Sequence, residues 1–236
     1  MRYVVLGDIH SNIAALDSVI EDIKTKDIDF ILCVGDMVGY APYPNEVINL
    51  MRKQNILCIQ GNYDKAIGNR ELVCGCDYKE EKQLEQAGIS VMFTNLTVSN
   101  ENRAYLKALP KEIRIKAGEL NVLVVHGSPR SQTEYLFEDS NEVAEVTKEL
   151  AEDVLICGHT HKPYYKVING KHVINSGSVG KPKHGNPNAT YVLVSIAEKN
   201  LNVEIIEVPY DFEKTAKAIE ANEMLPDDFA KMLRKG

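Results

Sequence analysis

The sequence lacks a long hydrophobic run. No stretch of its 236 residues approaches the roughly 20 consecutive apolar residues that a membrane helix needs. The apolar segment Met1–Leu6 runs directly into the polar pair Gly7 and Asp8, which is not the pattern of an export signal. Neither membrane insertion nor export is therefore expected, and no membrane partner is predicted.

Cysteine is also scarce. The chain has five cysteines, an odd number, and Cys33, Cys58 and Cys157 lie inside apolar runs, as small buried hydrophobic residues often do. Cys74 and Cys76 are close in sequence but have no second cysteine pair with which to form a metal site, so we expect two free thiols. These features favour a reducing, cytoplasmic location.

An excess of basic residues is missing as well. Lysine and arginine number 27 against 34 acidic residues, which gives a formal net charge of −7. The chain as a whole therefore does not attract nucleic acid or an anionic membrane. A polyanionic substrate would have to be attracted locally, and bound divalent cations are often the largest charges in a site. Nucleic acid is accordingly not expected as a partner.

The composition is that of an ordinary globular protein. With 44% hydrophobic and 26% charged residues, the chain can bury a substantial core, and its length fits one domain over residues 1–236. Short apolar runs recur, as is typical of strands buried on both faces. They are Tyr3–Leu6, Phe30–Val34, Ile56–Ile59, Val122–Val125, Val154–Cys157, His172–Ile174, Tyr191–Ile196 and Val203–Val208. A helical pattern from Ile13 to Ile23, capped by Ser11 or Asn12, predicts that the first third is βαβαβ.

Three further segments complete the expected organisation. Residues 64–110 carry no clear strand and are predicted to form a helical insertion beside the sheet, in which Ser99 or Asn100 caps a short helix. A turn within 113–125 predicts a hairpin. The tail 212–234 is expected to be helical.

Polar clusters, each with a glycine in it, follow five of the predicted strands. They are Gly7-Asp8-Ile9-His10, Gly35-Asp36, Gly61-Asn62-Tyr63-Asp64, His126-Gly127 and Gly158-His159-Thr160-His161. In open α/β sheets ligands bind in the crevice outside the carboxyl ends of the strands, so these clusters are expected to converge in space. The glycines allow sharp turns and a close approach of the backbone to a ligand.

Each cluster taken alone has a structural explanation. Asp8 or Asp36 would cap a helix, His126 would be hydrogen-bonded in the core, and Asn62 would lie in a turn. The combination points to chemistry instead, because four of the six histidines fall at strand ends together with two aspartates and an asparagine.

The order of these motifs resembles that of the calcineurin-like metallophosphoesterases, whose pattern is D-x-H, G-D, G-N-H-D or G-N-H-E, H and G-H-x-H. The resemblance covers essentially the whole chain and is closest to the small prokaryotic phosphodiesterase branch, which has stretches similar to Asn102–Leu106 and Asn175–Gly180. It implies an α/β fold, a four-layer α/β/β/α sandwich of two mixed β-sheets, which periodicity alone does not reveal.

The resemblance assigns seven residues to two divalent metal ions. One ion would be held by Asp8, His10 and His161, the other by Asn62, His126 and His159, and Asp36 would bridge the two. Oxygen and nitrogen ligands without a thiolate suit Mn²⁺, Fe²⁺, Zn²⁺, Ni²⁺ or Co²⁺, of which Mn²⁺ is the first expectation. Two such ions about 3.5–4 Å apart can share a hydroxide and aim it in line at phosphorus.

The resemblance also implies residues at the reacting phosphate. The catalytic candidates are Asp36, Asn62, Tyr63, Asp64 and His126, and the substrate-binding candidates are Asn62, Tyr63 and Ser178. Tyr63 stands where the family has a histidine that touches the scissile phosphate and pairs with a carboxylate. Because its unperturbed pKa is about 10, Tyr63 would offer a neutral hydrogen bond. The alternative is a packing residue that points away from the metal ions.

The segment Asn175–Lys181 has small residues whose backbone amides would line a phosphate-sized pocket, or would form a plain surface turn. Lys183 and His184, just beyond it, are expected to be solvated loop residues.

Three functions fit this sequence. The leading hypothesis is an enzyme that hydrolyses small phosphodiesters, and also phosphomonoesters, by attack of a metal-bridging hydroxide. A metal-dependent nuclease is the second, and the acidic balance without a basic run counts against it. The third is a non-catalytic binding scaffold whose metal site has decayed, as in the retromer subunit similar to these enzymes. The presence of all seven ligands argues for catalysis.

Overall fold

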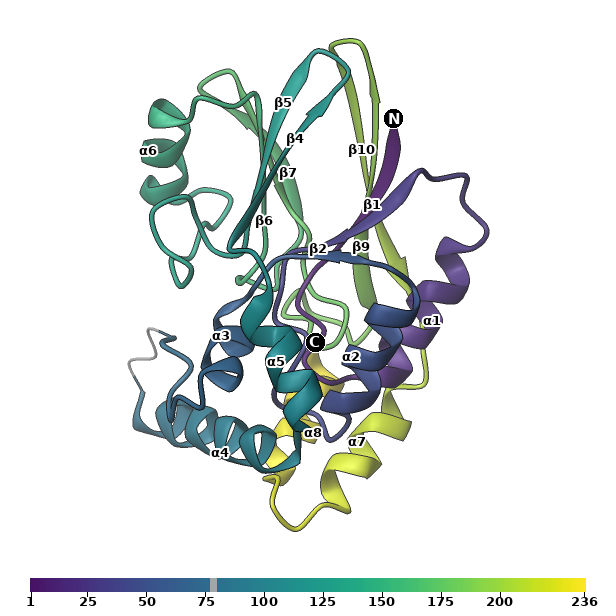
Figure 1. Cartoon of the computed structure of the whole chain (residues 1–236), viewed down its shortest axis with the longest axis vertical. Helices are drawn as coiled ribbons and strands as arrows, with labels where there is room; N and C mark the ends of the chain where they lie inside the picture. Colours follow the sequence, from purple (N-terminus) through teal and green to yellow (C-terminus); the bar gives the residue numbers. More distant parts are fainter. Residues whose placement is uncertain (77–79) are drawn as a thin grey trace.

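Two mixed five-stranded sheets form the centre of the molecule (Figure 1). The computed structural model describes residues 1–76 and 80–236. The first sheet, in spatial order, consists of β10 (Asn200–Val208), β9 (Ala189–Ala197), β1 (Arg2–Leu6), β2 (Phe30–Cys33) and β3 (Leu57–Cys58). The second consists of β4 (Glu112–Ala117), β5 (Leu120–Val125), β6 (Val154–Cys157), β8 (Lys171–Asn175) and β7 (Tyr164–Ile168). Strands β1, β2 and β3 are parallel, as are β5, β6 and β8, whereas β9 is antiparallel to β1 and β10, β4 to β5, and β7 to β8.

The sheets pack face to face because their strands alternate buried residues between two faces. Tyr3 and Val5 of β1 enter the core between the sheets, whereas Val4 and Leu6 contact the helices outside. From the second sheet, the core between the sheets receives Ala117, Leu120, Val122, Val124, Val154, Ile156 and Ile174. The predicted four-layer α/β/β/α sandwich is thereby confirmed.

Helices cover both outer faces of the sandwich. The outer face of the first sheet packs against residues of α1 (Ile13–Ile23), α2 (Pro44–Lys53), α4 (Glu81–Thr97), α5 (Asn100–Ala108), α7 (Phe212–Glu220) and α8 (Asp227–Lys235). The second sheet is covered by α6 (Asn141–Glu149), which lies apart from the other helices in Figure 1. None of the helices among the described residues is long and apolar enough to cross a membrane.

Local sequence signals explain where several elements begin. The side chain of Asn12 accepts a hydrogen bond from the Ala15 amide at the start of α1, and Ser99 does the same for Asn102 in α5. Gly118 takes a left-handed φ of 60° in the turn of the predicted β4-β5 hairpin. The helical tail, the hairpin, and Asn12 and Ser99 as caps were among the predictions from the sequence, and the structure confirms them.

The segment 64–110 contains most of α3 (Asn62–Gly68) together with α4 and α5, and the structure places no strand in its described residues. Residues 77–79 of the predicted insertion lie outside the described residues. Two elements, α6 and β7, were not predicted. Strand β7 lies at the edge of its sheet and is only partly buried, so it lacks the continuous apolar run by which the other strands were identified.

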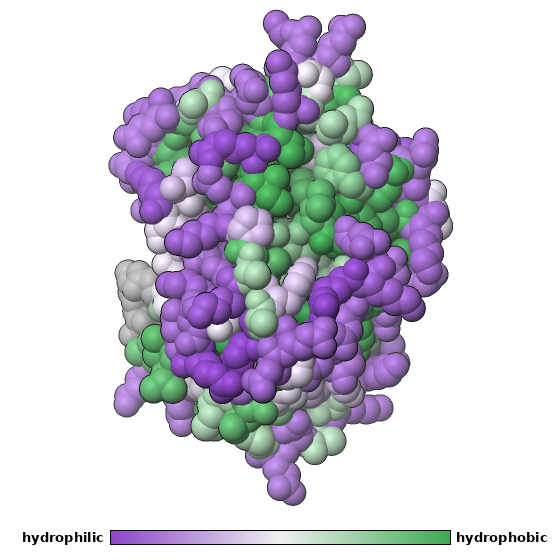
Figure 2. Space-filling view, viewed as in Figure 1, coloured by the Kyte–Doolittle hydropathy of each residue, from purple (hydrophilic) through white to green (hydrophobic). Residues whose placement is uncertain are grey.

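Hydropathy differs between the two halves of the face in Figure 2. Apolar residues gather over the strands in the upper half, and hydrophilic residues cover much of the helical lower half. The polar clusters lie where the strands end and the helical half begins, since each cluster follows the carboxyl end of a strand. The fold thus places them between its two halves.

Candidate active site

The polar clusters at the strand ends meet in one buried site. Asp8 and His10 follow β1, Asp36 follows β2, Asn62 begins α3 after β3, His126 follows β5, and His159 and His161 follow β6. All seven side chains are at most 4% exposed. The histidines and aspartates fall into two sets within which the ligand atoms lie no more than 4.8 Å apart. The first set is Asp8, His10 and His161, and the second is Asp36, His126 and His159.

The two sets adjoin at Asp36. Its Oδ2 atom lies 3.5 Å from His126 Nε2 in the second set and 3.8 Å from His10 Nε2 in the first set. Asp8 Oδ1 lies 3.5 Å from His161 Nε2 and 4.0 Å from His126 Nε2. Of these two oxygens, Asp36 Oδ2 makes the shorter contact with the other set, which is the position expected of a bridging ligand.

Backbone carbonyls orient three of the imidazoles. The Nδ1 atoms of His10, His126 and His161 lie 2.9, 2.8 and 2.6 Å from carbonyl oxygens of the chain. Because a carbonyl only accepts, Nδ1 carries a proton and donates it, so Nε2 is the nitrogen that can offer a lone pair to a metal ion. The ring of His159 is oriented by stacking on Tyr135, with centroids 4.3 Å apart. Tyr135 was not identified from the sequence.

Backbone amides orient the two carboxylates in the same way. Asp36 Oδ1 accepts a hydrogen bond of 2.8 Å from the Tyr63 amide, and Asp8 Oδ2 accepts one of 3.1 Å from the His159 amide. The other oxygen of each carboxylate faces the histidines. Asp8 Oδ1 and His159 Nε2 are buried and have no hydrogen-bond partner among the described residues. Such buried acceptors are costly unless something positive occupies the space between them, so the donor set fits divalent cations.

The protonation states also suit metal binding. Burial lowers the pKa of His10 and of His159 to about 3, so both imidazoles are neutral at pH 7 and can act as ligands. Burial also lowers the pKa of His126, but the charge of Asp36 outweighs it and raises that pKa to about 9. Burial raises the pKa of Asp36, whereas the charge of His126 brings it down to about 2. A cation bound there would replace the proton of His126.

Strained backbone marks the same residues. His10, Asp36, His159 and His161 have left-handed φ values between 47° and 64°. Such a conformation is uncommon for residues other than glycine, costs about 1–3 kcal/mol each, and clusters at functional sites. Gly61 is required for a different reason, because a Cβ atom there would overlap both the backbone nitrogen and Oδ1 of Asp36.

Asn62 faces the second set with its oxygen. Asn62 Oδ1 lies 2.9 Å from His126 Nε2, and its Nδ2 donates to the Cys74 carbonyl at 2.9 Å and to Cys76 Sγ at 3.2 Å. No pattern in the sequence predicts that this cysteine loop lies at the site. Its two sulfur atoms are 2.9 Å apart, and their mutual hydrogen bond lowers the pKa of Cys74 to about 7.

Tyr63 and Asp64 adjoin the ligands. The buried Tyr63 ring makes an edge contact with His10, with centroids 5.3 Å apart, so it lies beside the first set. Asp64 accepts 3.0 Å hydrogen bonds from the amides of Met37 and Gly61. It therefore connects the loop that carries Asp36 to the start of α3.

Ser178 connects two loops in this structure. Its hydroxyl donates to the Asp8 carbonyl at 2.6 Å and accepts from the Lys181 amide at 2.8 Å, and the residue is fully buried. Its amide donates to Thr190 Oγ1. These contacts hold Asp8 in place, and a direct contact of Ser178 with substrate stays a prediction.

Two cavities flank the site. One, of about 490 Å³, is lined by Asn62 and His126 together with Arg130. The other, of about 300 Å³, is lined by Tyr40 and Lys183 among others. Lys183 and His184 lie in a loop, as predicted, but both are partly buried, and Lys183 lines the second cavity.

Known proteins of similar sequence identify the family of this chain. The model of the calcineurin-like phosphoesterase superfamily domain matches residues 1–199. An uncharacterized protein of Methanocaldococcus jannaschii is 33% identical over 237 residues, a match that covers 93% of this chain and 92% of that protein.

Two solved structures are similar over nearly their whole length. A metallophosphoesterase from Sphaerobacter thermophilus has a TM-score of 0.77 at 25% identity and covers 99% of this chain and 98% of its own. A hypothetical protein from Pyrococcus horikoshii has a TM-score of 0.81 at 28% identity, with 100% of this chain and 98% of its own covered.

Proposed function

Because the chain belongs to the calcineurin-like phosphoesterase superfamily, we propose that it hydrolyses small phosphodiesters, and also phosphomonoesters, with two divalent metal ions. The observation that carries this proposal is the pair of adjoining buried His/Asp sets that share the Oδ2 atom of Asp36. The family and these two sets together identify the chain as a metal-dependent phosphoesterase with a candidate binuclear site.

The first ion is assigned to Asp8, His10 and His161, the second to Asn62, His126 and His159, and Asp36 is assigned to both. When bound, two such ions supply Lewis-acid activation of the water nucleophile and offset the charge that develops on the phosphate oxygens. Mn²⁺ is the ion we propose first, and Fe²⁺, Zn²⁺, Ni²⁺ and Co²⁺ suit the same nitrogen and oxygen donors.

The chain's own contribution is to hold the ligands in place before substrate arrives. Carbonyl groups fix the imidazole tautomers, and the amides of Tyr63 and His159 fix one oxygen of each carboxylate. We assign Asp64 and Ser178 to this positioning, and Asn62 and Tyr63 to the side from which the phosphate approaches.

The metal requirement is the direct test. Purified protein is expected to contain two divalent ions per chain, and chelation should lower the kcat/KM for bis-p-nitrophenyl phosphate at least about 100-fold, because each ion supplies several kcal/mol of charge stabilisation. Added Mn²⁺ should restore the rate. A panel of mono- and diesters assayed with each ion then identifies the preferred substrate and metal. Full metal content without turnover of any ester would instead support the non-catalytic scaffold. Faster cleavage of DNA than of any small ester would support the nuclease.

Replacing Tyr63 by histidine tests the departure from the family motif. A monoester is close to dianionic at pH 7 and gains more from a cationic contact than a singly charged diester does. We therefore expect Tyr63→His to raise the ratio of kcat/KM for p-nitrophenyl phosphate to that for bis-p-nitrophenyl phosphate about fivefold or more, given the strength of charge-assisted hydrogen bonds. Tyr165→His on β7 is the matched control. An unchanged ratio in Tyr63→His would mean that this side chain only packs.

A further inference from the structure

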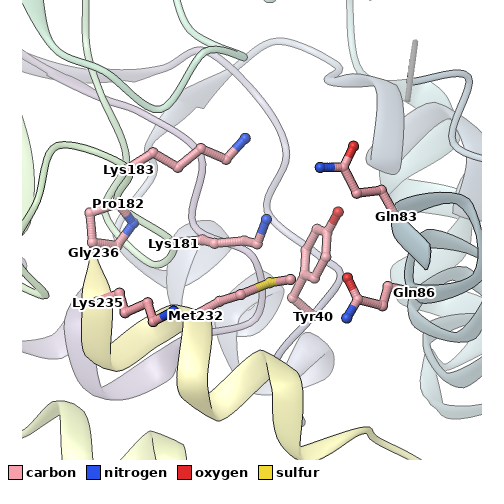
Figure 3. A pocket seen from close by; sticks show the side chains of 9 residues that line it. All are labelled: Tyr40, Gln83, Gln86, Lys181, Pro182, Lys183, Met232, Lys235 and Gly236. Carbon is pink, nitrogen blue, oxygen red and sulfur yellow. The ribbon is translucent and has the colours of Figure 1, made fainter. Parts of the chain in front are cut away.

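A basic cavity lies beside the first set of ligands. It is formed by four segments, the loop after β8, the loop of Tyr40, helix α4 and helix α8. In Figure 3 the side chains of Lys181 and Lys183 extend toward Tyr40 and toward Gln83 of α4. The cavity has a volume of about 300 Å³, at the lower end of the range for small-molecule pockets and ample for a phosphate or carboxylate group.

The charge of this cavity is opposite to that of the chain. Three lysines, Lys181, Lys183 and Lys235, line it, and no aspartate or glutamate does so among the described residues. The described residues also offer no carboxylate within 4 Å of the Lys181 or Lys183 amine, whereas Lys82 and Lys231 pair with Asp228 at 2.7 and 3.1 Å. In a chain of net charge −7, unpaired and partly buried lysines are a local exception.

The nearby carboxylate is already engaged. Asp228 of α8 binds Lys82 and Lys231 and also accepts a 3.1 Å hydrogen bond from Gln86 Nε2. It therefore does not neutralise the two lysines of the loop.

The cavity lies next to the first set of ligands. The amine of Lys181 lies 3.9 Å from the centroid of the Tyr40 ring, and that ring lies 4.9 Å from the His10 ring. The carbonyl of Lys181 accepts the hydrogen bond from His161 Nδ1. One aromatic ring thus separates the lysine amine from the first set, while the larger cavity opens on the other side, at Asn62 and His126.

We propose that the cavity of Lys181 and Lys183 binds a second anionic group, a phosphate or a carboxylate, carried by one arm of the phosphoester substrate. The proposal rests on the proposed function, in which the scissile phosphate lies on the two sets of ligands and its arms extend to the two sides. Lysine amines are compact point charges without a fixed planar fork, so they accept either anion. Substrates with a neutral or cationic arm on this side are disfavoured.

The test measures binding without turnover. Mn²⁺-loaded protein is titrated calorimetrically with phosphonates, whose C–P bond is not a phosphoester. Propylphosphonate has a neutral arm, 2-carboxyethylphosphonate and propane-1,3-diphosphonate have anionic arms, and 2-aminoethylphosphonate has a cationic arm. We expect the anionic arms to lower the Kd about tenfold or more relative to propylphosphonate, as ion pairs that are partly desolvated do, and the cationic arm to raise it. Comparing the two anionic probes distinguishes carboxylate from phosphate.

Charge-removing variants locate the effect. Lys181→Met, Lys183→Met and the double variant should bring the Kd ratio between the anionic and neutral probes to within about twofold of one. Lys166→Met removes an exposed lysine of β7 that pairs with Asp139. This variant should keep the wild-type ratio. This control separates a local contact from the change in net charge.

The outcomes separate the two proposals. Equal Kd values for the neutral and anionic probes in wild-type protein, or no binding of any phosphonate, would overturn the proposed cavity function. Preference for anionic arms without hydrolysis of any ester would leave the cavity assignment standing and remove the proposed enzymatic function. Hydrolysis of esters without a preference for anionic arms would leave the proposed enzymatic function standing and remove the cavity assignment.

Discussion

Replacing Asp36 by asparagine is expected to lower kcat/KM for bis-p-nitrophenyl phosphate by about 10³-fold or more, while the protein stays folded. Asp36 Oδ2 lies 3.8 Å from His10 Nε2 and 3.5 Å from His126 Nε2, so it approaches histidines of both sets. A neutral amide is a poor bridge between two cations. The amide oxygen can still accept the hydrogen bond from the Tyr63 amide, so the loop keeps its main support.

Asp139→Asn serves as the matched control, since it makes the same chemical change at an exposed residue that pairs with Lys166. It should leave the rate unchanged. Metal content is measured for both variants and circular dichroism checks their folding. Activity of Asp36→Asn within tenfold of the wild type, at equal metal content, would contradict the bridging role.

Adding a single methyl group at Gly61 is expected to damage both stability and activity. The new Cβ atom would overlap the backbone nitrogen and Oδ1 of Asp36, neither of which is a flexible chain end that can move aside. Overpacking of this kind destabilises a protein by about 1–3 kcal/mol. Because the displaced group is the shared ligand, and misplacement by about 1 Å can reduce a rate 10²-fold, Gly61→Ala should also lose at least about that factor in kcat/KM.

Gly88→Ala in α4 is the control for this substitution. A Cβ atom at Gly88 meets nothing within 4 Å, and alanine is favoured over glycine inside a helix by up to about 1 kcal/mol. Urea unfolding should therefore show a lower midpoint for Gly61→Ala and an equal or higher midpoint for Gly88→Ala. A wild-type midpoint and wild-type activity for Gly61→Ala would show that the two loops are not in the close contact described.

Several features of the molecule follow from short stretches of sequence. Buried strands are encoded by runs of apolar residues, and Asn12 and Ser99 cap their helices through hydrogen bonds that reach only three residues along the chain. The polar clusters after the strands are equally local. Because parallel strands bring their carboxyl ends to one edge, local patterns were sufficient to predict that these clusters converge.

Other features depend on contacts between segments that are far apart in the chain. The hydroxyl of Ser178 donates a hydrogen bond to the carbonyl of Asp8, 170 residues away, a contact that no local pattern predicts. Lys183 was expected in solvent, but its loop folds against the site beside α4 and α8 and leaves its charge facing a cavity. The loop of Cys74 and Cys76 bore no sequence signal of a place next to Asn62.

The sequence by itself determined which residues are chemically able to bind metal ions and which strands carry them, because those properties belong to side chains and to their immediate neighbours. Only the tertiary structure decided that one oxygen of Asp36 is shared between the two sets and that Lys181 and Lys183 lie unpaired beside them. The physical reason is that these arrangements arise where two sheets and their loops pack together. Such packing joins Asp8 and Ser178, which are 170 positions apart, a separation over which periodicity and capping carry no information.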